Sequence, residues 1–170
     1  YYCAIVGKYG VQVQAALKKA AALDIKVICP LHGPVLDSEL GRYLALYDKW
    51  SKYEPEAHGV VVAYTSVYGH TAAAANALAD AVEAAGVTVE RFDLARCDMY
   101  VAVAAAFRYD RLVLATTTYN MSYFPPMREF ISYLAERGFR SRTVGIVENG
   151  SWAPVAAKLM RAELEQLKDI

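Results

Sequence analysis

The feature that most constrains this fold is a regular alternation of β-type and helix-type segments from Val60 onward. Short runs rich in β-branched and aromatic residues are separated by helix-length amphipathic stretches. This pattern predicts a doubly wound parallel sheet with helices on both faces, an α/β fold. The predicted strands are residues 60–64, 88–92, 112–115 and 143–147.

Three helices are predicted between and after these strands. The alanine-rich stretch 71–85 has high helix propensity and ends at Gly86. Residues 125–137 begin with prolines, end before Gly138 and carry Phe130, Ile131 and Leu134 on one face. A last helix begins near Pro154 and carries a core-facing apolar stripe at helical spacing.

The first 57 residues have a different character. They predict a helix over 11–23, a short strand over 25–29, a rigid loop over 30–34, a second helix over 38–53 and a linker at 54–56. So few elements cannot form a core of their own. We therefore interpret residues 1–57 as the end of a domain whose remainder is absent, and residues 58–170 as a separate α/β domain.

Composition excludes several classes of partner. Eighteen basic residues balance eighteen acidic ones, so the chain has no basic footprint for nucleic acid or a membrane surface. Cys3, Cys29 and Cys97 lack any C-x-x-C spacing, which argues against disulfides and zinc and favours a reducing, cytoplasmic setting. We expect no membrane span and no signal peptide, and the missing initiator Met suggests an excerpt of a longer chain.

Polar and aromatic residues follow three of the predicted strands. In an open parallel sheet a ligand binds beyond the carboxyl ends of the strands, so these clusters are expected to meet there. The predicted binding residues are Ser66, Val67, Tyr68, Gly69, His70 and Thr71 after the first strand; Thr117, Thr118, Tyr119 and Asn120 after the third; and Asn149, Gly150, Ser151 and Trp152 after the fourth.

The first cluster suits a single phosphate. Amides in a tight strand-to-helix turn form an anion-binding nest, and the helix adds its positive N-terminal end. Ser66 and Thr71 add hydroxyl donors, and His70 could add an N–H, although hydroxyl residues before a helix are also ordinary N-caps. Tyr119 and Trp152 are candidates to stack on a flat heteroaromatic ring, or simply to cover the end of the core.

Other ligand classes and chemistries are disfavoured. The chain has neither G-x-G-x-x-G after the first strand nor a Gly-Lys-Ser/Thr triplet. Ser66 has no His/Asp partner at a meaningful spacing, and no catalytic carboxylate pair is identifiable, so we predict no catalytic side chain. Two alternatives stay open: an NAD(P)H-dependent quinone or flavin reductase of the same fold, and an interaction domain without a cofactor.

From about His58 to its end, the chain resembles the flavodoxin-like domain of flavodiiron proteins, the A-type flavoproteins. The resemblance rests on the run 65–71, on Thr117-Thr118-Tyr119-Asn120 followed by Phe124-Pro125-Pro126-Met127, and on Asn149-Gly150-Ser151-Trp152. It implies that the first loop holds the phosphate of FMN and the other two lie along the isoalloxazine ring. The implied role is electron transfer through that cofactor.

Residues 28–34 are similar to the closing segment of the family's metallo-β-lactamase-like domain. The resemblance implies that His32 is the last ligand of a diiron centre that reduces dioxygen or nitric oxide in the complete parent protein. A lone His32 cannot hold a metal pair, so we expect this chain to bind no iron. The implied partners are a redox donor such as rubredoxin or an NAD(P)H-linked reductase, and further copies in a homodimer or larger assembly.

One departure from the family concerns the sheet. The four predicted strands give the order 2-1-3-4, whereas a flavodoxin-like sheet has the order 2-1-3-4-5. We expect the fifth strand to be missing and the fourth to form an open edge.

Overall fold

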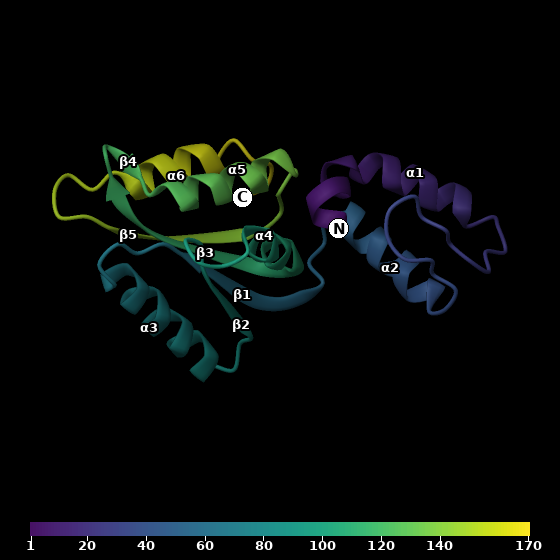
Figure 1. The fold of residues 1–170 in the computed structure, drawn as a ribbon, viewed down its shortest axis with the longest axis horizontal. Coiled ribbons are helices and arrows are strands. Elements are labelled where there is room, and N and C mark those ends of the chain that lie inside the picture. The colour runs from purple at the N-terminus through teal and green to yellow at the C-terminus, as the bar shows by residue number, and fades with distance from the viewer.

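The computed structural model describes all residues, Tyr1–Ile170, as an α/β unit with a helical N-terminal segment beside it (Figure 1). The N-terminal segment contains η1 (Tyr2–Val6), η2 (Gly7–Tyr9), α1 (Gly10–Ala20) and α2 (Leu40–Ser51). The α/β unit contains β1 (Ala57–Tyr64), α3 (His70–Ala84), β2 (Val89–Asp93), α4 (Met99–Arg108), β3 (Tyr109–Tyr119), β4 (Ser122–Tyr123), α5 (Pro125–Glu136), β5 (Thr143–Asn149) and α6 (Ala156–Leu164).

Four parallel strands form the sheet in the order β2-β1-β3-β5. This confirms the predicted order of the four parallel strands. The two-residue strand β4 makes the sheet mixed, because it pairs antiparallel with the end of β3. Asn120 and Met121 form the turn between them with φ values of 48° and 57°, as a two-residue hairpin requires. The strand β5 pairs with β3 alone, and none of its residues is buried.

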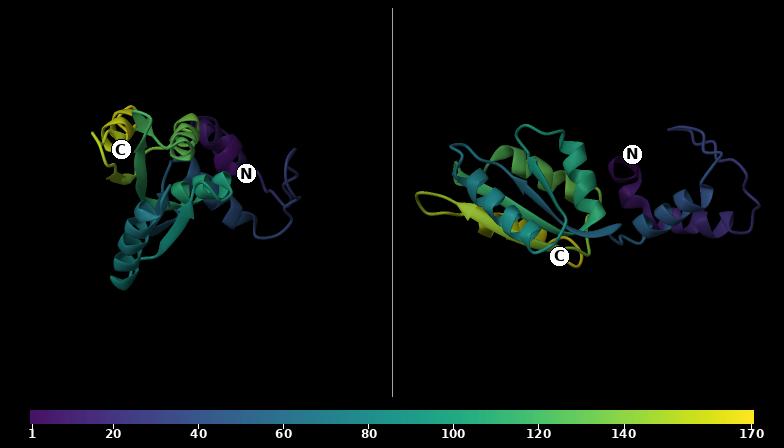
Figure 2. Two further views of the ribbon diagram at one scale, coloured as in Figure 1. Left: turned by 60° about the vertical axis from the view of Figure 1, so that its left-hand side comes forward. Right: turned by 90° about the horizontal axis from the view of Figure 1, so that it is seen from below.

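Helices cover the two faces of the sheet unequally. On one face, α4, α5 and α6 pack on the larger core cluster, and on the other α3 packs on a smaller one (Figures 1 and 2). Side chains of β1 alternate between them, with Val61 and Ala63 in the larger cluster and Val60 and Val62 in the smaller. This alternation follows from the two-residue period of a strand.

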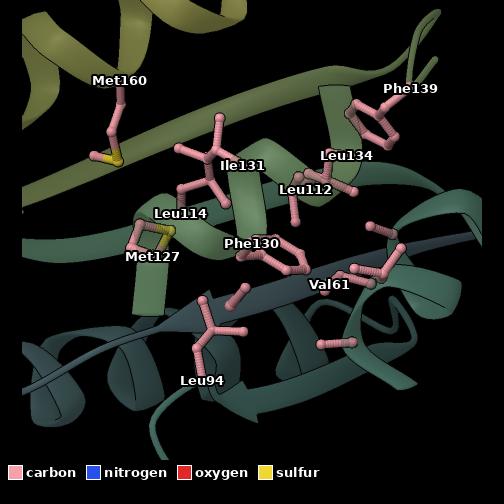
Figure 3. Packing of buried hydrophobic residues seen from close by; sticks show 14 of the residues in the cluster. Val61, Leu94, Leu112, Leu114, Met127, Phe130, Ile131, Leu134, Phe139 and Met160 are labelled. Carbon is pink, nitrogen blue, oxygen red and sulfur yellow. The ribbon is translucent and has the colours of Figure 1, made fainter. Parts of the chain in front are cut away.

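The larger core is built from large apolar side chains of the central strands and of α5 (Figure 3). Phe130 is fully buried between the sheet and its neighbouring helices, and Ile131 and Leu134 lie on the same face of α5, as predicted. The apolar stripe predicted for the last helix is partly buried. Met160 and Leu164 are buried, whereas Val155, Leu159 and Leu167 are half-buried.

Two expectations about elements need correction. Residues 25–29 form no strand, because only an isolated bridge joins Ile28 to Leu36 and no other strand lies beside it. The helix α4 was not predicted, although Asp98 caps it by accepting a hydrogen bond from the Tyr100 N–H at 2.9 Å. Such an N-cap residue is a sequence signal for the start of a helix.

The N-terminal segment contributes little to the core. Tyr2 is its one buried hydrophobic residue, and none of its residues belongs to either core cluster of the sheet. Apolar side chains of α1, α2 and residues 25–36 instead line a cavity of about 620 Å³. The segment therefore lacks a packed core of its own.

A buried arginine joins the linker to the amino ends of the strands. Arg142 is 5% exposed, and its guanidinium donates hydrogen bonds to the carbonyls of Tyr53 (2.6 Å), Phe107 (2.7 Å) and Tyr109 (2.8 Å). It also donates to the carbonyls of Arg140 and Ser141. Burial lowers the pKa of this guanidinium, and the five carbonyl dipoles offset the cost of removing its charge from water.

No helix combines the length and the apolar composition that crossing a membrane requires.

Replacing Phe130 with alanine should lower the free energy of unfolding by about 3–5 kcal/mol, because removal of a fully buried aromatic ring leaves a cavity between the sheet and its helices. Urea unfolding followed by circular dichroism measures this change. Val101→Ala, on the exposed side of α4, is the control and should change it by less than about 0.5 kcal/mol. Equal losses in the two variants would contradict the burial of Phe130 in the core.

Candidate functional site

The three predicted binding segments meet at the carboxyl edge of the sheet. They follow or end β1, β3 and β5, which are neighbours in the sheet, and they lie at the end away from the N-terminal segment (Figures 1 and 2). Tyr64 of β1 is in register with Ala115 of β3, and Thr117 of β3 is in register with Asn149 of β5. Residues far apart in the sequence are therefore brought to one place.

The segment Ser66–Thr71 forms a tight turn into α3. The Gly69 N–H donates to Ser66 Oγ at 3.0 Å, and Gly69 has a φ of 90°, which favours glycine. No side chain caps α3, a helix of 15 residues. The N–H groups of its first turn are thus available to an anion, and the helix dipole favours negative charge there.

The turn offers neutral donors to such an anion. Val67, Tyr68 and His70 are exposed, Ser66 is half-buried and Thr71 is buried. No Lys or Arg lies in the turn. This donor set fits one monophosphate, held by amides and hydroxyl groups, better than a polyphosphate chain.

A buried pair of hydroxyl groups lies directly before the first two binding segments in the sequence. Thr65 Oγ1 and Thr116 Oγ1 lie 2.6 Å apart, and both residues are fully buried. The pair joins Thr65, which follows β1, to Thr116 of β3, and each of them directly precedes one of the first two binding segments. The sequence places hydroxyl residues after the predicted strands but does not indicate that Thr65 and Thr116 meet.

The second and third segments are more regular than predicted. Thr117, Thr118 and Tyr119 belong to β3, and Asn149 belongs to β5, so these residues are in strands and not in loops. The strands are longer than predicted because they pair with each other, which the strand propensity of single residues does not show. β5 pairs with β3 as far as Thr117, and the hairpin with β4 extends β3 further. Asn120 lies in the hairpin turn, and Gly150, Ser151 and Trp152 lie in the loop after β5.

Two side chains at this edge cap α6, a role that the sequence did not reveal. Thr118 Oγ1 accepts hydrogen bonds from the N–H groups of Val155 (2.9 Å) and Ala156 (3.2 Å). Glu148 Oε2 accepts one from the Ala157 N–H at 3.0 Å. These bonds hold the end of the Trp152 loop where it enters α6.

Asn149 joins the three segments. Its side-chain Nδ2 donates to Thr71 Oγ1 at 3.3 Å, and its carbonyl accepts from Thr117 Oγ1 at 3.1 Å. One residue at the end of β5 thus contacts the first turn of α3 and the end of β3.

Aromatic side chains are exposed around this edge. Tyr68 and Trp152 are each 88% exposed and Tyr119 is 50% exposed. The ring of Tyr119 meets Phe124 edge-on, with ring centroids 5.3 Å apart. Exposed aromatic rings beside a nest of donors suit a ligand that has a flat ring and a phosphate.

His32 lies far from this edge, in the N-terminal segment. It is exposed, and its ring centroid is 6.4 Å from that of Tyr1. No group of three or more His, Cys, Asp or Glu residues is arranged to hold a metal ion. The residues present do not form a metal centre.

Comparison with known proteins identifies the family. Residues 61–169 match the flavodoxin domain family, and the chain belongs to it. Among curated relatives, diflavin flavoprotein A 4 of Synechocystis is 26% identical over 155 residues, 91% of this chain and 26% of its own length. A type A flavoprotein of Rhodobacter capsulatus is 26% identical over 174 residues, 99% of this chain and 40% of its own length.

Solved structures agree in fold. The flavodiiron protein of Giardia intestinalis superposes with a TM-score of 0.91 at 25% identity, over 98% of this chain and 41% of that one. The rubredoxin oxygen:oxidoreductase of Desulfovibrio gigas superposes with a TM-score of 0.89 at 20% identity, over 98% and 42%. The chain thus spans between about a quarter and two fifths of the length of these relatives.

Replacing Thr118 with valine should lower the free energy of unfolding by about 1 kcal/mol, because two N–H groups at the start of α6 lose their acceptor. Thr117→Val is the matched control, since the Thr117 hydroxyl caps no helix, and it should cost less. Chemical denaturation of both variants measures the difference. A larger loss for Thr117→Val would contradict the capping role.

Proposed function

We propose that this chain is the FMN-binding, electron-transfer part of a protein related to the flavodiiron proteins. The observation that carries the proposal is the joining of three segments by Asn149 at one edge of a flavodoxin-family sheet. Those segments combine an uncapped helix N-terminus, hydroxyl groups and exposed aromatic rings. These are the groups that a flavin with one phosphate requires.

Each segment has its own part in holding the cofactor. Ser66, Gly69, His70 and Thr71, with the backbone of Val67 and Tyr68, hold the phosphate. Thr117, Tyr119 and Asn120 would lie along the ring, and Thr118 keeps the adjoining loop in place. The main chain of Asn149, with Gly150, Ser151 and Trp152, would also lie along the ring, and Trp152 would stack on it. FMN, when bound, supplies transfer of electrons one at a time, and the protein supplies binding, orientation and exclusion of water.

The flavodiiron chemistry lies outside the residues of this chain. We propose that residues 1–57 end a metallo-β-lactamase-like domain in which His32 ligates a diiron centre of the complete protein. That protein would reduce dioxygen or nitric oxide with electrons passed on by residues 58–170. We propose rubredoxin as the electron donor, because a structural neighbour of this chain is a rubredoxin oxygen:oxidoreductase. An NAD(P)H-linked reductase is the alternative donor. We further propose a cytoplasmic location and a homodimeric or larger assembly.

Titration of the purified chain with FMN tests the cofactor. Because free flavin fluorescence is quenched on stacking against aromatic rings, we expect saturable quenching with one FMN per chain. Riboflavin, which has the same ring and no phosphate, should bind more weakly. Absence of saturable binding by folded protein would refute the proposed function.

Changing Ser66 to aspartate should weaken FMN binding at least tenfold and leave riboflavin binding within about threefold, because the new carboxylate repels only the phosphate. Ser141→Asp adds the same charge at the other end of the sheet, where Ser141 is exposed with a φ of 55° that Asp tolerates. This control should bind both flavins like the parent chain. Equal weakening of both flavins by Ser66→Asp would place the phosphate elsewhere.

Changing Trp152 to alanine should weaken FMN and riboflavin equally, by about three- to tenfold, because a stacking contact acts on the ring that both ligands share. Val11, 81% exposed on α1 and remote from the edge, gives the control Val11→Ala, which should change neither constant. Isothermal titration calorimetry measures both. A loss confined to FMN would contradict a ring contact for Trp152.

A further inference from the structure

The side chain of Asn149, at the end of β5, reaches the first turn of α3. Its Nδ2 lies 3.3 Å from Thr71 Oγ1, across 78 positions of sequence. Thr71 is 2% exposed and sits in the first turn of α3. Asn149 thus contacts the phosphate turn with its side chain, although its main chain belongs to the ring side of the site.

This contact restricts where the hydrogen of the Thr71 hydroxyl can point. A threonine hydroxyl has one hydrogen to donate and two lone pairs that accept. Because Thr71 Oγ1 accepts from Asn149 Nδ2, its own hydrogen points away from that amide and is left to donate to another group. A buried hydroxyl hydrogen without an acceptor is unfavourable, so a phosphate oxygen at the N-terminus of α3 would complete its bonding.

The position of Asn149 is itself held firmly. Its backbone is in parallel register with Thr117, and Thr117 Oγ1 donates to its carbonyl at 3.1 Å. The strand β3 beside it is central in the sheet. The backbone of Asn149 is therefore fixed relative to β3, and this places its side-chain amide beside Thr71.

We propose that Asn149 is a positioning residue that turns the Thr71 hydroxyl toward the phosphate, and so raises the preference of the site for FMN over unphosphorylated riboflavin. This inference rests on the proposed function and assigns to the Asn149 side chain a part that a ring contact would not have. The preference for the phosphate then depends on a residue of the neighbouring strand as well as on the turn.

A double-mutant cycle tests the inference. Asn149→Ala, Thr71→Val and the double variant are each titrated with FMN and with riboflavin. Asn149→Ala should weaken FMN binding about three- to tenfold, as expected for one hydrogen bond, and riboflavin binding less than twofold. In the Thr71→Val background, Asn149→Ala should cause no further loss of FMN affinity, since the hydroxyl that it orients is gone.

Thr71→Ser is the conservative control. It keeps the hydroxyl, so Asn149→Ala should again weaken FMN binding selectively in that background. Circular dichroism and riboflavin binding show for each variant whether the fold and the ring site are intact, which separates a positioning effect from loss of structure.

The outcomes distinguish the two claims. Additive losses in the cycle, or equal weakening of both flavins by Asn149→Ala, would overturn the positioning role while leaving the proposed function in place. Failure of the parent chain to bind either flavin would overturn the proposed function itself. Selective and non-additive loss of FMN affinity supports both.

Discussion

The structure depends on the central strand β3, which pairs in parallel with β1 on one side and with β5 on the other. Parallel pairing places the carboxyl ends of neighbouring strands at one edge, and the register decides which residues meet there. The Thr65–Thr116 hydroxyl pair and the Thr117–Asn149 contact are direct results of this register. A shift by one residue would turn these side chains to the opposite face of the sheet.

Stability and function are located in different parts of this sheet. The large core lies under α4, α5 and α6 and consists mainly of apolar side chains. The candidate cofactor residues are mostly exposed or half-buried and add little apolar packing. Such a separation lets the edge keep unpaired donors and exposed rings, which a packed core would not tolerate.

Much of the α/β unit could be predicted from periodicity, since α3, α5 and the four parallel strands follow clear patterns. The hairpin strand β4 could not, because it needs positive φ at Met121, a residue without turn preference. Residues 25–29 have strand composition but no neighbouring strand to pair with. Likewise, the residue types at the edge were predictable, whereas the Asn149–Thr71 and Thr118–Val155 bonds join residues 78 and 37 positions apart and depend on register.

The five acceptors around Arg142 are all main-chain carbonyls, supplied by the residues Tyr53, Phe107, Tyr109, Arg140 and Ser141. Every amino acid carries that group, so side-chain substitutions at these five positions leave the junction's acceptors unchanged. A carbonyl does not titrate, and ions in solution reach a buried contact poorly, so the angle between linker and sheet resists changes of acidity and ionic strength. The junction thus depends on one side chain, because replacing Arg142 removes all five bonds at once, whereas the acceptors belong to the chain itself.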